Sequence, residues 1–328
     1  MISVITSTYN KDKYLDLTLA GYINQTCDDF EIVIVDDGSI DGTKKIIEKY
    51  ESHLNIQYYW QENRGIAYAR NMALQLAKGN IIIIVDDDRI PCRNFIASHK
   101  HTLEENGKTV SIGKQGSIVS HYTPELSFSF SEGMKFYNNH RDIINSGPSQ
   151  MFTVEDILYR FEDTIDNHFL SFPDLSCLIK MVDKFGDDLS EFKLAWSKAY
   201  GGNIAFDRSY LSQAIEYDTN YVGYGGEDVD LSYQLYLQGY KYYFSSNAIN
   251  YHQEHPRKKT ELLELIKNTR YFYDKFPHLE TFILKMDYDG VITLDQANSF
   301  MNLINKYGEE LLPLIKKFID KGELSKTQ

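Results

Sequence analysis

The first 88 residues alternate between short apolar runs and longer amphipathic stretches. Two of the runs, Ile32–Val35 and Ile81–Val85, are apolar at every position, which is typical of strands buried on both faces of a parallel sheet. The stretches between the runs have a helical pattern. Strands and helices that alternate in this way predict βαβ units. The expected strands are Ile2–Ser7, Phe30–Val35, Ile56–Trp60 and Asn80–Val85, and the expected helices are Asp12–Asn24, Thr43–Glu51 and Gly65–Lys78.

From residue 107 onward the pattern is less regular, and Val110–Val119 predicts either a strand or a hairpin. After Pro256 the strand-like runs stop and amphipathic stretches follow. We therefore expect an α/β domain over residues 1–255, with a Rossmann-like, mostly parallel sheet flanked by helices, and a helical region over residues 256–328. The other expected elements are the helices Asp156–Phe169, Leu175–Phe185, Asp228–Gln238, Thr260–Phe276, Leu294–Tyr307 and Glu310–Ile319, and the strands Ile204–Phe206, Tyr240–Ser245 and Ala248–His252.

The composition is that of a folded globular protein, because 42% of the 328 residues are apolar and 25% are charged. Lys and Arg number 34 against 47 Asp and Glu, which gives a formal net charge of −13. A chain this acidic is a poor general binder of nucleic acid, since that affinity comes mainly from cationic contacts to phosphate. A phosphate-bearing ligand would therefore need a local basic patch or a metal ion.

The sequence predicts a cytoplasmic protein. Its longest purely apolar run, Ile81–Val85, is far shorter than the ~20 residues that cross a bilayer. The N-terminus has no basic stretch followed by a long apolar one, so no cleaved signal peptide is expected. The three cysteines, Cys27, Cys92 and Cys177, form no C-x-x-C pair, which argues against a disulfide framework or a zinc site.

Polar residues collect directly after each of the four expected N-terminal strands. In an open parallel sheet the carboxyl ends of the strands lie at one edge, where ligands bind. One such cluster would indicate little, because turns are polar in any case. Four of them at one edge outline a binding site. The clusters are Thr8-Tyr9-Asn10, Asp36-Asp37-Gly38-Ser39, Glu62-Asn63-Arg64-Gly65 and Asp86-Asp87-Asp88.

The loop after the first strand contains neither G-x-G-x-x-G nor a Walker lysine motif. A nucleotide is therefore not held mainly by a glycine-rich phosphate cradle. The three adjacent carboxylates of Asp86–Asp88 would repel a phosphate unless a cation lay between them. Oxygen-rich sites of this kind suit Mg²⁺ or Mn²⁺. The alternative is that Asp86–Asp88 caps a helix and Asp36–Ser39 forms an ordinary turn.

These residues resemble the signature of family 2 glycosyltransferases of the GT-A fold. A second set, Gly201-Gly202-Asn203 and Gly225-Gly226-Glu227-Asp228, resembles the acceptor half of chondroitin-polymerase-like and galactosyltransferase-like enzymes. In those enzymes a W-G-G-E-D segment precedes a helix, and Tyr224 stands here in place of the tryptophan. The resemblance covers roughly residues 1–255. The segments that carry its first part are Thr8-Tyr9-Asn10, Val35-Asp36-Asp37-Gly38-Ser39, Asp41-Gly42-Thr43, Asn63-Arg64-Gly65, Ala69-Arg70-Asn71 and Asp86-Asp87-Asp88.

The resemblance implies a role for each matching residue. It implies that Asp228 is the catalytic base and that Glu227 holds sugar hydroxyls. It implies Asp88 as a direct metal ligand, with Asp86 near the metal and His252 as a further ligand whose nitrogen favours Mn²⁺ over Mg²⁺. The alternative for His252 is an ordinary surface histidine, and His255 is a less favoured candidate for the same ligand role. The residues implied to bind the nucleotide sugar are Thr8, Tyr9, Asn10, Asp36, Asp37, Asn63, Arg64, Arg70, Asp86, Asp87, Gly202 and Asn203.

The resemblance implies metal-dependent transfer of a sugar from a UDP-sugar to a hydroxyl of a glycan, glycoconjugate or peptide, with inversion at the anomeric carbon. It is compatible with a homodimer and with peripheral association at the inner face of the membrane. A sugar-nucleotide pyrophosphorylase is an alternative, but it would carry a glycine-rich loop with Arg and Lys after the first strand. An inactive nucleotide-sugar-binding module is another, but it would be expected to lack Asp88 or Asp228, and both are present.

Overall fold

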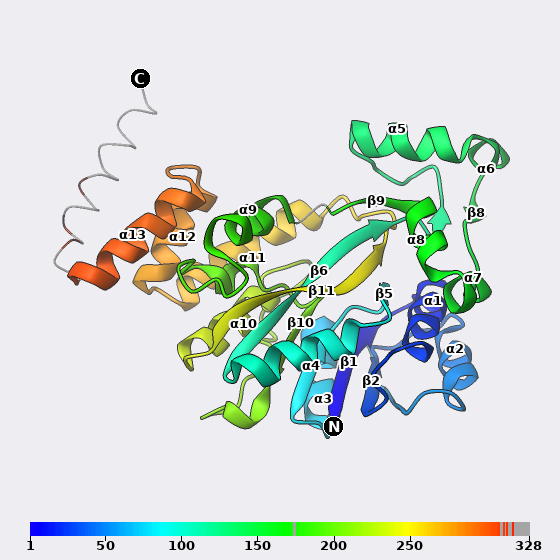
Figure 1. Ribbon diagram of the computed structural model, residues 1–328, viewed down its shortest axis with the longest axis horizontal. Coiled ribbons are helices and arrows are strands. Elements are labelled where there is room, and N and C mark those ends of the chain that lie inside the picture. Colours follow the sequence, from blue (N-terminus) through cyan, green and yellow to red (C-terminus); the bar gives the residue numbers. More distant parts are fainter. Residues whose placement is uncertain (173–174, 309–310, 312, 314–316, 318–328) are drawn as a thin grey trace.

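In the computed structural model the described residues are 1–172, 175–308, 311, 313 and 317, and within them a nine-stranded mixed sheet runs through the centre of the molecule (Figure 1). The strand order is β3 (Ile56–Trp60), β2 (Phe30–Asp36), β1 (Ile2–Thr8), β4 (Ile81–Ile84), β10 (Ile204–Asp207), β6 (Thr109–Ile118), β11 (Lys241–Gln253) and β5 (Arg89–Pro91), and β9 (Phe169–Ser171) pairs with β6 beside this path. The first four are the expected N-terminal strands, and they are parallel to one another. The predicted α/β class is confirmed.

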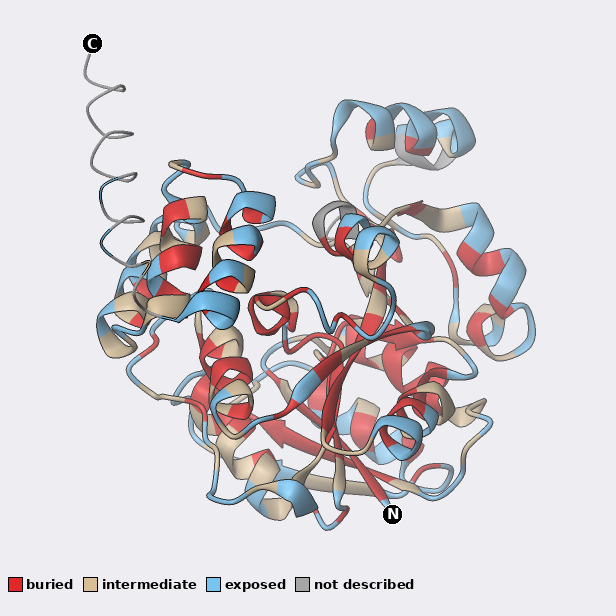
Figure 2. Cartoon of the chain, turned by 60° about the vertical axis from the view of Figure 1, so that its left-hand side comes forward, coloured by how far each residue is buried: buried red, intermediate tan, exposed pale blue. Residues whose placement is uncertain are grey.

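Different helices cover the two faces of the parallel half of the sheet. Val4 of β1 packs in one hydrophobic cluster with Leu15, and the next residue, Ile5, packs in the other with Ala69. Successive side chains of a strand point to opposite faces of the sheet. A strand covered by helices on both faces therefore needs apolar side chains on both faces. Figure 2 shows these strands buried beneath the helices. The helices are α1 (Asp12–Ile23) and α2 (Thr43–Tyr50) on one face and α3 (Ile66–Leu76) on the other.

The second half of the sheet brings a histidine to the polar edge. β10 runs antiparallel between β4 and β6, and β11 lies parallel to β6. The two strands expected over Tyr240–Ser245 and Ala248–His252 form the single strand β11, whose pairing register shifts between Ser245 and Ile249. As a result β11 continues past β5, where His252 pairs with Arg89.

Several elements differ from the expectation. The helix predicted over Asp156–Phe169 is two helices, α7 (Val154–Tyr159) and α8 (Phe161–His168), because the backbone of Arg160 leaves the helical region at φ −138° and ψ 38°. The predicted helix Leu175–Phe185 is confirmed as α9. Further elements have too little periodicity to be predicted from the sequence. They are α4 (Phe95–Asn106), β7 (His121–Tyr122), α5 (Phe130–Asn139), α6 (Arg141–Ser146), β8 (Ser149–Gln150) and α12 (Leu279–Tyr288), together with β5 and β9.

The helices α11 (Glu261–Lys275), α12 and α13 (Leu294–Tyr307) contribute to one hydrophobic cluster with α10 (Glu227–Leu237) and with strands of the sheet. Phe272 of α11 and Ile283 of α12 belong to the same hydrophobic cluster as Trp196 and Leu231. The core of the molecule therefore extends into these helices. The helix predicted over Glu310–Ile319 lies largely outside the described residues. Among the described helices, none has the length and apolar character that crossing a membrane requires.

Candidate active site

Two buried aspartates hold the loops at the carboxyl ends of β2 and β3. The Asp37 carboxylate accepts hydrogen bonds from the backbone N–H groups of Arg64 (2.9 Å) and Gly65 (2.8 Å). The Asp36 carboxylate accepts one from the backbone N–H of Ser39 at 2.7 Å. The family resemblance implies that both aspartates bind the nucleotide. Their contacts also fix the positions of the loops at this edge of the sheet.

The other residues expected in the nucleotide pocket lie around these loops. Thr8 is buried at the end of β1, whereas Tyr9, Asn63 and Arg64 are exposed. Asn10 has a left-handed backbone (φ 53°), which asparagine tolerates better than most residues. Its side-chain oxygen accepts a hydrogen bond from the backbone N–H of Ile40 at 2.9 Å, which ties the loop after β1 to the loop after β2.

Arg70 connects three carboxylates at the centre of the site. Its guanidinium donates to Asp86 (2.7 Å), Glu227 (3.0 Å) and Asp228 (2.7 Å). The other oxygen of Asp86 pairs with Arg89 Nε at 3.0 Å. The side chain of Arg70, expected near the base or diphosphate of a nucleotide, is buried and links Asp86, just beyond β4, with the first turn of α10.

Burial and charge set the protonation of the two acids on α10. Burial, together with the neighbouring Asp228, raises the pKa of Glu227 to about 7, although Arg70 opposes the rise. Burial also raises the pKa of Asp228, and Arg70 is the strongest influence in the opposite direction. Arg70 therefore favours the ionised form of Asp228, which is the form that a general base needs.

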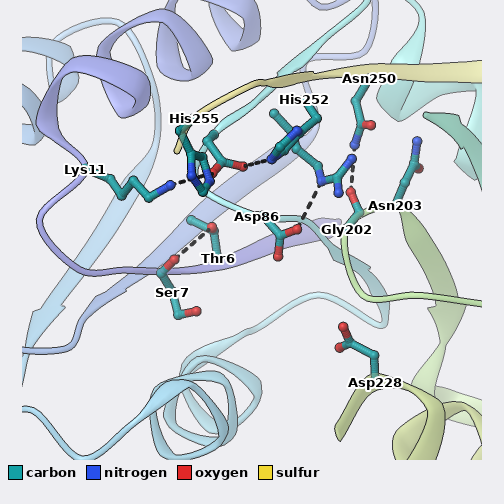
Figure 3. A network of polar contacts seen from close by, with 12 residues as sticks. Thr6, Ser7, Lys11, Asp86, Gly202, Asn203, Asp228, Asn250, His252 and His255 are labelled. Atoms are coloured by element: carbon teal, nitrogen blue, oxygen red, sulfur yellow. Dashed lines mark hydrogen bonds and ion pairs between the residues drawn. The ribbon is translucent and has the colours of Figure 1, made fainter. Parts of the chain in front are cut away.

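A second acidic centre lies around Asp88, which is 5% exposed. Its carboxylate is 2.8 Å from Lys11 Nζ, 3.2 Å from His255 Nε2 and 3.7 Å from His252 Nε2. Ligand atoms of Asp88, His252 and His255 all lie within 4.8 Å of one another, so these three residues could hold a metal ion. Asp86 is outside this group, with its oxygens paired to arginines. Figure 3 shows Lys11 and the two histidines on one side of the site and Asp228 on the other.

The two buried aspartates of this centre have opposite pKa shifts. Burial opposes ionisation of Asp88, but His252, Lys11 and His255 together hold its pKa well below the usual range. Burial and the charge of Asp88 raise the pKa of Asp87 to about 7. Asp88 is therefore the member of the pair that carries a negative charge at neutral pH, as a metal ligand must.

The side chain of Asn203 is used inside the protein. It is fully buried, its oxygen lies 2.8 Å from His99 Nε2, and its amide group donates to the carbonyl oxygen of Ala248 at 3.0 Å. The carbonyl oxygen of Gly202 accepts a hydrogen bond from Asn250 at 2.7 Å. Both residues were expected to bind the nucleotide sugar, and their described contacts join the segment that enters β10 to β11 beside the site.

Sequence reasoning missed Lys11 and Arg89, and it favoured His252 over His255 as a metal ligand. Lys11 follows the Thr8-Tyr9-Asn10 cluster directly, and its position there was the signal that could have identified it. His255 is three residues beyond His252, a spacing at which two side chains can reach the same centre. Arg89 follows the three aspartates and neutralises Asp86, a pairing that the sequence alone does not reveal.

Comparison with known proteins assigns two parts of the chain. Residues 3–163 match a family model described as glycosyl transferase family 2. Residues 185–258 match a model described as the N-terminal domain of galactosyltransferase. Together the two matches contain Arg70, the possible metal ligands Asp88, His252 and His255, and the Gly225–Asp228 segment. The expected resemblance is confirmed.

Two relatives and one solved structure illustrate the range of similarity. The uncharacterized glycosyltransferase YfnE of Bacillus subtilis is 27% identical over 313 residues, which cover 93% of this chain and 78% of the relative. Chondroitin synthase of Escherichia coli is 29% identical over 299 residues, and these cover 87% of this chain but only 40% of the synthase. The structure of Staphylococcus aureus TarS 1-349 in complex with UDP-GlcNAc has a TM-score of 0.54 at 19% identity and covers 94% of this chain and 74% of that one. It shares the fold.

Proposed function

Because this glycosyltransferase belongs to family 2 and has the GT-A fold, we propose that it moves a sugar from a UDP-sugar to a hydroxyl group of a carbohydrate or glycoconjugate, with inversion at the anomeric carbon. One observation carries the proposal. Two acidic centres, at Asp88 and at Asp228, lie at the same edge of the sheet, and Arg70 joins Asp228 to Asp86, two residues before Asp88 in the chain. The first suits a cation and a diphosphate, and the second suits an acceptor hydroxyl. Release of UDP from a panel of UDP-sugars in the presence of Mn²⁺ tests the proposal, and no release from any of them would contradict it.

The comparisons support the two substrates in different ways. TarS has this fold and was solved with UDP-GlcNAc, which supports a UDP-sugar donor. Chondroitin synthase is named for a polysaccharide product, which supports a carbohydrate acceptor. The match to glycosyl transferase family 2 disfavours the alternative of a sugar-nucleotide pyrophosphorylase. The presence of Asp88 and Asp228 in one site disfavours an inactive binding module.

The residues around Asp88 fit a divalent cation. One carboxylate and two imidazoles offer an oxygen and two nitrogens close together, and the carboxylate is ionised. Nitrogen ligands favour Mn²⁺ over Mg²⁺, so we propose Mn²⁺ as the cofactor, held by Asp88, His252 and His255. When bound, such an ion supplies positive charge that stabilises a departing diphosphate. Lys11 adds a further positive charge at the same place.

Asp228 is placed to accept the proton of the acceptor hydroxyl. As the proton passes to the Asp228 carboxylate, the acceptor oxygen bonds to the anomeric carbon and the bond from that carbon to the diphosphate breaks. Attack opposite the leaving group inverts the configuration. Glu227 adds a second contact, because its Oε2 is buried and has no hydrogen-bond partner among the described residues. That oxygen can accept a hydrogen bond from a sugar hydroxyl.

Replacing Arg70 with methionine is expected to move the acidic limb of the kcat–pH profile to higher pH by about one to three pH units. Arg70 lowers the pKa of Asp228, so its loss raises that pKa and a higher pH is needed to form the base. Arg70→Lys keeps the charge and should shift the limb less. If Arg70→Met lowers kcat at every pH but leaves the acidic limb at the same pH, Arg70 does not set the pKa of the base.

A further inference from the structure

The helix α11 lies against the loop that leads into Glu227 and Asp228. Glu264, Leu265 and Asn268 approach this loop, and Phe272 and Lys275 follow on the same helical face. Residues three, four or seven positions apart lie on one side of a helix, so a single stripe makes all these contacts. We call residues 222–226 the acceptor loop because they precede the proposed base.

Asn268 holds the backbone of the acceptor loop at three points. Its side-chain amide donates to the carbonyl oxygens of Val222 (3.2 Å), Tyr224 (3.2 Å) and Gly225 (2.8 Å). The residue is 2% exposed. The carboxylate of Glu264 accepts a hydrogen bond from the backbone N–H of Tyr224 at 2.9 Å. Side chains of α11 thus satisfy backbone groups that belong to no helix or strand.

The glycines of the acceptor loop make this close approach possible. Gly225 and Gly226 have φ values of +81° and +99°, in the left-handed region that glycine adopts without strain. A Cβ atom on Gly225 would lie 2.7 Å from Leu265 Cδ1, and one on Gly226 would lie 3.0 Å from Asn268 Cβ. The loop is therefore shaped to fit this helix.

The helix itself is firmly attached to the core. Lys275 pairs with Asp230 of α10 at 2.6 Å and with Asp218 at 2.7 Å. The ring of Phe272 lies 5.9 Å from that of the fully buried Trp196. A helix fixed in this way can transmit its own rigidity to the acceptor loop.

We propose that Asn268 and Glu264 are positioning residues that hold the acceptor loop and thereby set the place of Asp228 relative to the anomeric carbon. The proposal rests on the function proposed above. The loop joins α10 directly, so movement of Gly226 moves the turn that carries Asp228. The backbone N–H and carbonyl oxygen of Tyr224 both take part in these contacts, and the residue is 45% exposed. The hydrogen bonds of Asn268 described here reach none of the residues proposed to hold the donor.

The test compares Asn268→Asp, Asn268→Ala and Glu264→Ala with Arg270→Ala, a change on the exposed side of the same helix. Four quantities are measured on the full chain. They are hydrogen–deuterium exchange of the peptide spanning residues 222–227, the Kd for UDP with Mn²⁺, and kcat and KM for hydrolysis of the UDP-sugar that the wild type cleaves fastest among UDP-glucose, UDP-galactose, UDP-GlcNAc and UDP-GalNAc. Melting temperatures monitor folding.

Asn268→Asp replaces a donor with an acceptor that faces three carbonyl oxygens, so it should have the largest effect. We expect at least tenfold faster exchange in the 222–227 peptide and a kcat at least tenfold lower. We expect KM and the Kd for UDP to stay within twofold, and Arg270→Ala to resemble the wild type. Glu264→Gln, which keeps an accepting oxygen, should recover most of what Glu264→Ala loses.

Unchanged exchange in both Asn268 variants would overturn the proposal. So would a loss of UDP affinity that parallels the loss of kcat, because that would indicate a general structural role. If the wild type hydrolyses no UDP-sugar, the proposed function fails, and the exchange and UDP-binding results still decide whether the helix holds the loop.

Discussion

Asp228→Asn is expected to lower sugar transfer by ~10²–10⁴-fold while the affinity for UDP changes little, since that is the usual cost of losing a positioned general base. Asparagine has nearly the same shape but accepts no proton at neutral pH. The Asp228 carboxylate lies in the first turn of α10, and Arg70 donates a hydrogen bond to its Oδ1. Gly201 leaves room for the same oxygen, because a Cβ atom at that position would collide with it. The direction of the side chain is therefore fixed before any acceptor arrives.

The measurement is the initial rate of transfer, paired with calorimetric binding of UDP in the presence of Mn²⁺. Arg70 keeps two other carboxylate partners in this variant, Asp86 and Glu227, so the fold is expected to survive, and a melting curve checks this. Near wild-type transfer would show that Asp228 is not the base, and Glu227, with its pKa of about 7, would be the first residue to test in its place.

Removing the divalent cation is expected to abolish activity, and Mn²⁺ is expected to restore it better than Mg²⁺. The reason is the donor set of one carboxylate and two imidazoles around Asp88, in a protein whose net charge of −13 otherwise repels a diphosphate. Asp88→Asn removes the ionised ligand and should weaken Mn²⁺ binding by at least 100-fold, as measured by calorimetry on the variant without nucleotide.

The matched control for this prediction is Asp274→Asn, which changes an exposed acid on α11. It should leave Mn²⁺ affinity within twofold of the wild type. His255→Ala separates the geometric assignment from the sequence-based one, because the structure places His255 with Asp88 and Asp86 with two arginines. Mn²⁺ affinity that drops in Asp86→Asn but not in His255→Ala would contradict the assignment made from the structure.

The parallel half of the fold could be predicted because its signals are local. The run Ile56–Trp60 is a strand with the expected bounds, and Ile81–Val85 needs no distant contact to be recognised as buried. The continuous strand β11 could not be predicted, since its register shift is defined by pairing with β6, more than a hundred residues away in the sequence. The break at Arg160 is a single residue outside the helical region, which the helical pattern around it does not reveal.

The candidate site shows the same division. Asp88 and Asp228 could be identified because each lies in a short segment of consecutive motif residues, Asp86-Asp87-Asp88 and Gly225-Gly226-Glu227-Asp228. The contacts of Arg70 and Asn203 could not, because their partners come from other parts of the chain. Asn203 contacts His99 of α4. Polar residues such as His99 and Thr102 lie on the buried face of that helix, so the sequence does not show which face is buried.

The most direct test of the central claim is UDP release from UDP-glucose, UDP-galactose, UDP-GlcNAc and UDP-GalNAc by the wild type with Mn²⁺, repeated in excess EDTA and with Asp228→Asn. We predict that at least one donor yields UDP with the wild type and Mn²⁺, and that release is lost in EDTA and falls by ~10²–10⁴-fold in the variant. No UDP from any donor, or undiminished release in EDTA, would contradict the account.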